Sequence, residues 1–282
     1  MVDCPTAFVT GWPVEHSRSP MIHGHWLRTY GLQGNYVKHG CAPEEFADFI
    51  FNLETYGFVG GNITLPHKQQ AFQLIQNRDA EAQRLGAVNT VWLDKGVLRA
   101  TNTDGYGFLA NLDDQCPGWD NHDNRQRGAL VLGAGGASRA IIDSLKERKF
   151  SLITIANRTR AKAESLVQQF GPVCQAVDYS GLQPEHRTAA VIVNTTSLGM
   201  NDQSQAIDLD GFAKDTVVCD IVYTPLITPL LQQARNLGMQ SVDGLGMLLH
   251  QAVPGFEKWF GVRPEVDAAL KDLVLADLGE SR

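Results

Sequence analysis

The chain contains 282 residues, of which 43% are hydrophobic and 20% are charged. A chain of this length buries enough apolar surface for one large domain or two ordinary ones, and we expect two. Its net charge of -7, without a long basic run, excludes the electrostatic footprint of a nucleic-acid-binding protein. We therefore expect a small molecule as the partner.

The cysteines and the apolar runs indicate where such a protein works. Its five cysteines are scattered and contain no CxxC pair, which favours reduced thiols in a cytoplasmic protein. The N-terminus has no basic, apolar leader, and no segment approaches the ~18 uninterrupted apolar residues of a membrane span. We expect a cytoplasmic protein whose partners include neither a membrane nor a nucleic acid. A homodimer is an open alternative.

The first hundred residues mix predicted strands and helices. Alternating apolar residues predict strands, and apolar residues spaced by about three to four predict amphipathic helices. The sequence predicts strands over 7–11 and 59–65, helices over 19–30, 42–53 and 66–76, and a hairpin of 87–93 with 97–100. Such a mixture is typical of an α/β domain.

The second half of the chain alternates strands and helices more regularly. A polar, turn-rich run at 116–128 separates it from the first region. We predict strands over 129–132, 151–156, 189–196, 216–222 and 240–243, and helices within 133–145, 160–170 and 227–237. This alternation predicts a parallel, doubly wound sheet. Two helical stretches, 245–260 and 264–278, follow without another strand and fit either domain.

The stretch NITLPHK begins at Asn62 and ends at Lys68. In a strand, Asn62 and Thr64 face the side opposite to Ile63 and Leu65, so we expect one polar face and one packed face. The proline that follows favours the first turn of a helix. Lys68 then lies near a helix amino end, where the macrodipole disfavours positive charge, so its position calls for another reason.

The run GAGGASRA follows a predicted strand and opens a helix. This is the context in which a dinucleotide fingerprint brings backbone NH groups to a pyrophosphate. Ser138 stands where the third glycine often falls, and no GK[ST] follows, which argues against a triphosphate P-loop. The alternative is a glycine-rich turn of an ordinary α/β domain. The predicted cofactor contacts in this turn are Gly133, Ala134, Gly135, Gly136 and Ala137.

The end of the next predicted strand indicates which dinucleotide is bound. Sites for NAD usually place a carboxylate roughly 20 residues after the glycines, whereas a 2′-phosphate calls for an arginine. Here the strand ends in Asn157, Arg158 and Thr159, with Lys162 one turn later. We therefore predict NADP(H) as the cofactor and these four residues as contacts. Alternatively, Arg158 is a solvated loop charge.

Three further polar features have more than one interpretation. Asn89 lies inside an apolar run and needs either buried partners or a ligand. Asp104 precedes a predicted helix, where an aspartate is commonly an N-cap. The segment 194–200 follows a predicted strand, where doubly wound sheets hold their ligands, although it could simply be a polar loop.

His23 and His25 do not predict a metal site. Positions two apart on a helix face different directions, and no Cys or acidic cluster supports the pair. No Ser/His/Asp or Cys/His nucleophile can be nominated from the spacing. We predict no bound metal.

Ordered motifs along nearly the whole chain resemble the shikimate dehydrogenase family. They are HSRSP (16–20), NITLPHK (62–68), GAVNT (86–90), NTDG (102–105), GAGGASRA (133–140), NRT (157–159), NTTSLGM (194–200), DIVYTPLITPLL (220–231) and DGLGMLLHQA (243–252). So many motifs in one order make coincidence implausible. One departure follows Met200, where the chain reads NDQSQAID and the family commonly has a proline-containing loop.

This resemblance implies a two-domain α/β fold. An α/β substrate-binding domain would comprise residues 1–104 plus 244–282, and a doubly wound Rossmann-type NADP-binding domain would comprise 105–243. The implied activity is the reversible, NADPH-dependent reduction of 3-dehydroshikimate to shikimate in aromatic amino-acid biosynthesis. The alternatives are a quinate/shikimate paralogue that also uses NAD, a non-catalytic NADPH-binding regulator, and an α/β oxidoreductase with an unrelated substrate.

The resemblance also implies roles at the matching positions. Lys68 and Asp104 resemble the catalytic pair. Ketone reduction by hydride transfer needs a proton for the new hydroxyl, so we predict that Lys68 donates it and that Asp104 orients the lysine and the hydroxyl. The implied substrate contacts are Ser17, Ser19 and Tyr223 at the carboxylate, and Thr64, Asn89 and Gln251 at the ring hydroxyls. The implied cofactor contacts beyond the glycine-rich turn are Thr195, Ser197, Gly244 and Met247, the last of them near the nicotinamide.

Overall fold

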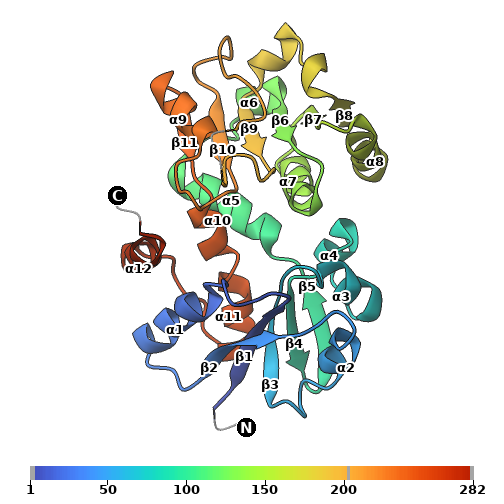
Figure 1. Cartoon of the computed structure of the whole chain (residues 1–282), viewed down its shortest axis with the longest axis vertical. Helices are drawn as coiled ribbons and strands as arrows, with labels where there is room; N and C mark the ends of the chain where they lie inside the picture. The colour runs from blue at the N-terminus through green and yellow to red at the C-terminus, as the bar shows by residue number, and fades with distance from the viewer. Residues whose placement is uncertain (1–3, 202–203, 280–282) are drawn as a thin grey trace. The chain divides into compact units, whose positions relative to one another are not determined.

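The computed structural model describes residues 4–201 and 204–279 and forms two compact units. The first unit combines the chain up to Thr103 with the segment from Leu249 onward, and the second spans Asp104–Leu248. From the sequence, Asp104 and residues 244–248 were expected in the first domain, whereas in the structure they belong to the second unit. Figure 1 shows the course of the chain. The terminal limits expected at 1 and 282, and part of the departure after Met200, lie outside the described residues.

A five-stranded mixed sheet forms the centre of the first unit. Its strands, in spatial order, are β2 (Asn35–Gly40), β1 (Thr6–Gly11), β3 (Phe58–Ile63), β4 (Thr90–Asp94) and β5 (Val97–Thr101). The first three are parallel, and β4 and β5 form an antiparallel hairpin. Lys95 and Gly96 both have positive φ values, 52° and 79°, as a tight hairpin turn requires. The predicted hairpin is confirmed.

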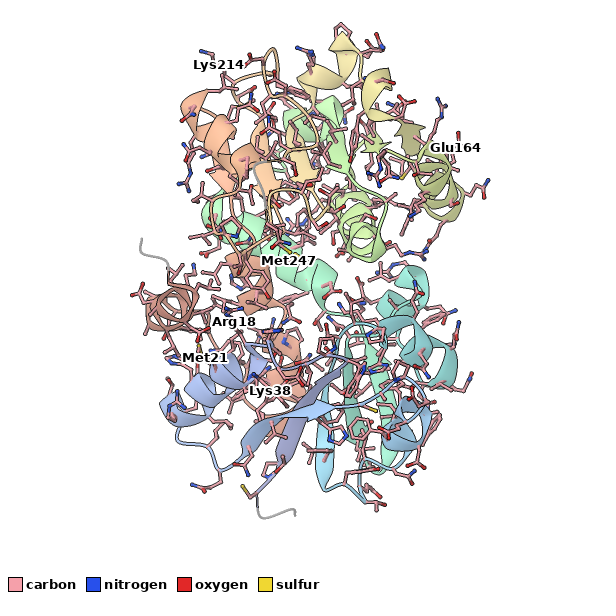
Figure 2. The ribbon with its side chains drawn as sticks, viewed as in Figure 1. Arg18, Met21, Lys38, Glu164, Lys214 and Met247 are labelled. Carbon is pink, nitrogen blue, oxygen red and sulfur yellow. The ribbon has the colours of Figure 1, made fainter. Side chains whose placement is uncertain are left out.

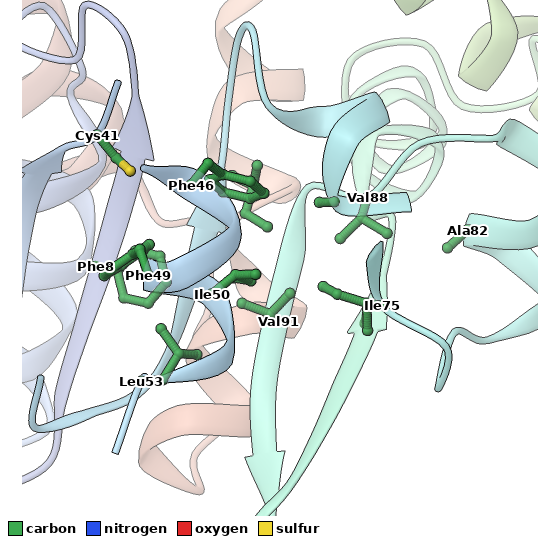
Figure 3. Close-up of a cluster of buried hydrophobic side chains, with 13 residues drawn as sticks. Phe8, Cys41, Phe46, Phe49, Ile50, Leu53, Ile75, Ala82, Val88 and Val91 are labelled. Carbon is green, nitrogen blue, oxygen red and sulfur yellow. The ribbon is translucent and has the colours of Figure 1, made fainter. Parts of the chain in front are cut away.

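Helices cover both faces of this sheet. They are α1 (Ser19–Thr29), α2 (Phe46–Phe51), α3 (Lys68–Leu74), α4 (Ala80–Leu85) and α11 (Val253–Phe260), whereas α12 (Ala268–Leu278) packs against α1 and α10 (Leu245–His250) contains the junction with the second unit. Side chains alternate across β1: Phe8 packs against Phe49 of α2 with ring centroids 5.0 Å apart, in the cluster drawn in Figure 3. Ala7 and Val9 pack on the opposite face with Trp259 of α11.

The C-terminal helices are fastened to the first unit by two indole NH groups. The Nε1 of Trp259 donates to the carbonyl of Val91 at 2.8 Å, and the Nε1 of Trp26 donates to the carbonyl of Glu265 at 2.9 Å. The backbone of β3 must approach the indole closely, because a Cβ on Gly60 would lie 2.5 Å from the Trp259 Nε1. Glycine alone fits there.

Several predicted elements in the first unit are wrong in extent. β3 ends at Ile63, and Leu65, expected on the packed face, is 73% exposed because a turn at 65–67 ends the alternation. Asn62, expected on a displayed polar face, is 6% exposed and bonded inside the unit. The proline before Lys68 lies in that turn, outside α3. The helix predicted over 42–53 is confined to α2, the one over 245–260 is α10 and α11, and the sequence does not predict β2 or α4.

The second unit contains a six-stranded parallel sheet, which confirms the predicted doubly wound arrangement. Its strands, in spatial order, are β11 (Gln240–Val242), β10 (Val217–Asp220), β9 (Val191–Asn194), β6 (Ala129–Leu132), β7 (Ile153–Ala156) and β8 (Cys174–Val177). The helices are α5 (Asp104–Gln115), α6 (His122–Arg127), α7 (Gly136–Glu147), α8 (Arg160–Phe170) and α9 (Pro229–Asn236), with short 3₁₀ turns at Tyr179–Gly181 and Pro184–Thr188. No described helix is long and apolar enough to cross a membrane.

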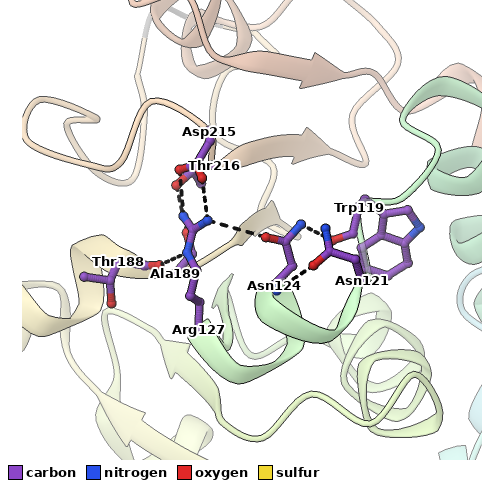
Figure 4. A network of polar contacts seen from close by, with 8 residues as sticks. All are labelled: Trp119, Asn121, Asn124, Arg127, Thr188, Ala189, Asp215 and Thr216. Atoms are coloured by element: carbon purple, nitrogen blue, oxygen red, sulfur yellow. Dashed lines mark hydrogen bonds and ion pairs between the residues drawn. The ribbon is translucent and has the colours of Figure 1, made fainter.

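The polar run at 116–128 is part of the second unit and does not separate two regions, contrary to the prediction. Its Trp119 is 1% exposed, and it contains α6. The Asn124 side chain donates to the carbonyl of Trp119 at 3.0 Å, and Arg127 makes two bonds to Asp215, at 2.7 and 2.9 Å (Figure 4). Side-chain hydrogen bonds therefore order a segment whose composition resembles that of a linker.

His23 is a buried titratable group in the first unit. Its ring is fully buried, stacks on Tyr36 with centroids 4.0 Å apart, and makes no hydrogen bond of good geometry within the described part of the chain. Burial lowers the pKa of His23 from 6.5 to about 3, and the opposing effect of the Asn62 side chain is smaller. The ring therefore stays neutral in the folded protein under conditions that protonate it in the unfolded chain.

We expect His23 to make the protein less stable in acid. Below pH 6.5 the His23 ring is protonated in the unfolded chain, whereas in the folded protein it is protonated only below about pH 3. The free energy of unfolding therefore falls as the pH falls from 6.5 to about 3. His23→Phe should reduce the slope of unfolding free energy against pH by about 1 kcal/mol per pH unit. Urea unfolding between pH 7 and pH 4 measures this. The same substitution at the exposed His122 should leave the slope unchanged, and an equal effect at both sites would contradict the expectation.

Candidate active site

The strands of the first unit end in polar residues at one edge of the sheet. β1 and β3 are parallel, and beyond β3 the NH of Thr64 donates to the carbonyl of Thr10 at 2.8 Å. β4 is antiparallel to β3, so its amino end lies at the same edge, where the NH of Ile63 donates to the carbonyl of Asn89 at 2.8 Å. We call the group formed by Thr10, Thr64, Lys68, Asn89 and Thr103 the polar edge.

The backbone of Lys68 is held at the polar edge from both sides. Lys68 is the first residue of α3, and the NH of the preceding His67 donates to the carbonyl of Thr64 at 2.9 Å. The Lys68 carbonyl accepts from the NH of Val88 at 2.9 Å. The His67 ring, given no role from the sequence, is buried and stacks on Phe46 at 4.4 Å between centroids. Lys68 therefore stands at a helix amino end, as predicted, on a rigid support.

The side chain of Asn89 is bonded within the first unit. It is 2% exposed, its Oδ1 accepts from the NH of Thr103 at 2.9 Å, and its Nδ2 donates to the Thr103 hydroxyl at 3.1 Å. That hydroxyl donates in turn to the carbonyl of Gln251 at 2.8 Å. Of the two possibilities that the sequence left open for Asn89, buried partners or a ligand, the structure shows the buried partners. Thr103, which the sequence did not single out, directly precedes Asp104.

Two of the predicted substrate contacts lie together at the start of α1. The Ser17 hydroxyl donates to the Ser19 hydroxyl at 3.2 Å and accepts from the NH of Ser19 at 3.3 Å. Between them, Arg18 forms an ion pair with Asp277 of α12 at 2.9 Å, so its side chain is engaged elsewhere. The arrangement presents two hydroxyl groups from one turn of chain.

In the second unit, the predicted cofactor residues gather where the strand order reverses. The chain continues from β6 to β7 on one side, whereas β9 lies on the other. At this point Thr195 donates from both its NH and its hydroxyl to the carbonyl of Leu132, each at 2.8 Å. Ligands of doubly wound sheets bind outside the carboxyl ends of the strands at such a switch point. Ser197 is exposed in the same loop.

The glycine-rich turn has one crowded glycine and two open ones. Gly133 has φ +107°, and a Cβ there would lie 2.7 Å from the Thr195 hydroxyl. A Cβ on Gly135 or Gly136 would meet nothing within 4 Å. α7 begins at Gly136, where the first NH groups of a helix lack internal partners. Open space beside a helix amino end suits the pyrophosphate of a dinucleotide.

The end of β7 presents cationic and amide groups. Asn157 donates from Nδ2 to the carbonyl of Thr159 at 2.8 Å, which holds the turn, while Arg158 and Lys162 are exposed. Glu164, further along α8, is paired with Arg160 at 2.9 Å. The strand end therefore carries an arginine and no carboxylate, as an NADP site requires.

The remaining predicted residues belong to the second unit, except Gln251. Asp104 is the first residue of α5, where the negative charge of a carboxylate interacts favourably with the helix dipole. Tyr223 is half-buried beyond β10, and Met247 is half-buried on α10 (Figure 2). A Cβ on Gly244 would collide with the carbonyl of Ile221, so the chain passes close there. No group of three or more His, Cys, Asp or Glu in the described part of the chain could hold a metal ion.

These features define a class of protein. A doubly wound unit with an open glycine-rich turn and an arginine at the next strand end is the construction of an NADP-binding domain. A second α/β unit that gathers a lysine, an amide and several threonine hydroxyls at one edge of its sheet has the polar side chains from which a site for a polar substrate is built. The combination is that of a two-domain, NADP-dependent dehydrogenase.

Comparison with known proteins identifies the family. Family models match the shikimate dehydrogenase substrate binding domain over residues 9–91, shikimate / quinate 5-dehydrogenase over 120–247 and the shikimate 5′-dehydrogenase C-terminal domain over 244–272. The chain belongs to the shikimate dehydrogenase family, which confirms the resemblance. The shikimate dehydrogenase (NADP⁺) of Rhizobium etli is 55% identical, with 97% of this chain and 96% of that protein covered.

Solved structures of the family share the fold. A shikimate dehydrogenase in complex with NADP⁺ superimposes with a TM-score of 0.88 at 30% identity, with 99% of this chain and 97% of that chain covered. The enzyme of Thermus thermophilus in complex with NADP(H) and shikimate has a TM-score of 0.83 at 33% identity, with coverages of 96% and 99%. The predicted two-domain α/β fold is confirmed.

Alanine at two glycines should separate cofactor binding from stability. Gly135→Ala places a methyl group in the open space of the turn, so we expect NADPH affinity to fall about tenfold or more with little change in melting temperature. Gly133→Ala forces a Cβ against Thr195 at a positive φ, so it should lower stability by about 1–3 kcal/mol. Fluorescence titration and thermal melts measure both. Unchanged NADPH affinity in a well-folded Gly135→Ala variant would contradict the assignment of this turn.

Proposed function

We propose that the protein catalyses the reversible, NADPH-dependent reduction of 3-dehydroshikimate to shikimate in aromatic amino-acid biosynthesis. The observation that carries the proposal is the polar edge, found in a chain of the shikimate dehydrogenase family. There the Lys68 backbone is bonded to Val88, and the adjacent Asn89 is bonded to Thr103, so the lysine backbone and the amide are held close to each other. Fixed geometry is what general acid catalysis requires.

The substrate contacts in this proposal follow the chemistry of the side chains. When the substrate binds, the Ser17 hydroxyl exchanges its bond to Ser19 for one to the substrate carboxylate, to which the Ser19 hydroxyl also donates, with Tyr223 near the same group. Thr64, Asn89 and Gln251 bind the ring hydroxyls, since hydroxyl and amide groups both donate and accept. Family membership supports these roles.

Proton transfer in this proposal belongs to Lys68. When bound, NADPH supplies the hydride that reduces the ketone carbon. The carbonyl oxygen then needs a proton, and the Lys68 ammonium donates it, whereas in the reverse direction the neutral amine takes it back. Asp104 orients the ammonium and the substrate hydroxyl, and its negative charge favours the protonated lysine that reduction needs.

Removal of the Lys68 amine should abolish most turnover. We expect Lys68→Ala and Lys68→Met to lower kcat at least about 100-fold, because a positioned general acid contributes about 10²–10⁴-fold. NADPH oxidation with 3-dehydroshikimate, followed by absorbance, measures this. Lys95→Met, at the exposed hairpin turn of the same unit, should match wild type. Near wild-type turnover in Lys68→Ala would refute the assignment.

A substrate panel tests the activity itself. We would assay 3-dehydroshikimate and 3-dehydroquinate, each with NADPH and NADH. Turnover confined to 3-dehydroshikimate with NADPH supports the proposal. Comparable rates with dehydroquinate or NADH would indicate the quinate/shikimate alternative, and NADPH binding without turnover of either substrate would indicate a regulator.

Arg158 should set the preference for NADP(H). A charged hydrogen bond to the 2′-phosphate contributes about 1.5–3 kcal/mol, so Arg158→Ala should lower the ratio of kcat/KM for NADPH over NADH by about 10–100-fold. Arg160→Ala, which removes an arginine already paired with Glu164, should leave the ratio unchanged. An unaltered ratio in Arg158→Ala would show that this guanidinium is a solvated loop charge.

The cellular setting is proposed on the same basis. All five cysteines are free thiols, which is typical of the reducing cytoplasm. The negative net charge argues against nucleic acid as a partner.

Sedimentation velocity would distinguish a monomer from a homodimer.

A further inference from the structure

A line of buried hydrogen bonds crosses the first unit from β2 to β4. The Tyr36 hydroxyl donates to Asn62 Oδ1 at 2.6 Å, Asn62 Nδ2 donates to the Thr90 hydroxyl at 3.1 Å, and that hydroxyl donates to Asn89 Oδ1 at 2.8 Å. All four side chains are buried, with exposures between 0% and 8%. The line ends on the amide that the proposed function places at the substrate.

The direction of each bond is fixed by the backbone carbonyl of Asn89, which can only accept. Asn62 can present either its oxygen or its nitrogen to a neighbour, and only the nitrogen, Nδ2, donates to that carbonyl, at 3.3 Å. Its Oδ1 then faces β2 and accepts from the Tyr36 hydroxyl. The Thr90 hydroxyl, which accepts from this amide, has its proton left for Asn89 Oδ1. Asn89 Oδ1 thus accepts both from the NH of Thr103 and from the Thr90 hydroxyl, and the second bond links the Asn89 amide to a phenol two side chains away.

The other end of the line, Tyr36, packs against the first turns of α1. Ser19 and His23 are four residues apart, so they share one face of this helix, and the His23 ring stacks on Tyr36. Burial raises the pKa of the Tyr36 hydroxyl well above its ordinary value, against the opposing effects of Ser19 and Asn62, so the phenol stays a donor. Tyr36 thus supports the turn that carries the paired serines.

Buried polar side chains need a reason, because apolar residues of similar size would fill the same space without the cost of desolvation. We propose that Tyr36 is a positioning residue that, through Asn62 and Thr90, fixes the orientation of the Asn89 amide relative to Ser19. In this role it acts on substrate recognition without touching the substrate. The inference rests on the proposed function and assigns residues that the family resemblance did not.

The test uses variants of the full-length enzyme that remove one link each. Tyr36→Phe removes the hydroxyl at the start of the line, and Thr90→Val removes the link in the middle while preserving shape. Thr90→Ser is the matched control, because it retains the hydroxyl and loses only a methyl group. Tyr30→Phe is a second control, since the Tyr30 hydroxyl accepts a bond from the NH of Glu265 at 3.1 Å, away from the line.

We expect a split between the two substrates in steady-state kinetics with shikimate and NADP⁺. Tyr36→Phe and Thr90→Val should each lower kcat/KM for shikimate by about tenfold, with KM for NADP⁺ within about twofold of wild type. Thr90→Ser should retain most of the activity that Thr90→Val loses. The double variant should lose little more than the worse single variant, because both substitutions break one line. Assays run below the melting temperature of every variant exclude losses due to unfolding.

Each other outcome has a definite meaning. Activity of Tyr36→Phe within about twofold of wild type would overturn the inference, and so would equal losses in Thr90→Val and Thr90→Ser. If Tyr36→Phe does not fold, the comparison of Thr90→Val with Thr90→Ser decides alone. Equal loss in Tyr30→Phe would reduce the effect to general destabilisation and also overturn it. Wild-type protein that does not turn over shikimate would overturn the proposed function and this inference together.

Discussion

The first unit depends on the pairing of polar side chains that its sheet buries. Asn62 and Thr90 lie on neighbouring strands and are bonded to each other, while Asn62 also accepts from Tyr36 and Thr90 also donates to Asn89. An unpaired buried amide costs about 1–3 kcal/mol, and a slip of one residue would turn each side chain to the opposite face. The bonds therefore fix the register of β3 and β4. The same register brings Lys68 and Asn89 to one edge, so the fold and the site share one set of hydrogen bonds.

The second unit builds its site by a different means. Here the backbone supplies the geometry: the chain turns sharply at Gly133, and open space lies beside Gly135. Side chains act mainly as supports, as where the buried Asp220 accepts bonds from Asn194, at 3.0 Å, and from Thr228, at 2.7 Å. Burial raises the pKa of Asp220, which these bonds partly offset. A backbone site tolerates changes in most neighbouring side chains but few changes in the glycines.

The sequence predicted the parts of this structure whose signal is local. All four residues of β6 are buried, so the strand is visible in the sequence as an apolar run. The glycines that follow it indicate a tight turn by themselves. In β2 only Tyr36 is buried, and α6 has no buried residue and is held by its Asn121 cap, so neither shows apolar periodicity. The role proposed for Tyr36 and the bonds of Thr103 to Asn89 could not be predicted, because they depend on which strands become neighbours. Lys68 could be singled out from the sequence because a cation at a helix amino end is locally unfavourable, and its catalytic role, which the family resemblance implies, stays a prediction.

Because the first unit is assembled from both ends of the chain, the order of synthesis matters. Trp259 bonds to Val91 across 168 residues of sequence, so the sheet leaves the ribosome long before the helix that covers one of its faces. At a synthesis rate of about 5–20 residues per second, that face of the sheet stays uncovered for roughly 10–30 s before the helix is made. During this interval all of the compact second unit has been synthesised, whereas the first unit still lacks its last helices. Newly made chains should therefore be most vulnerable to aggregation and to chaperone capture just before their last helices appear.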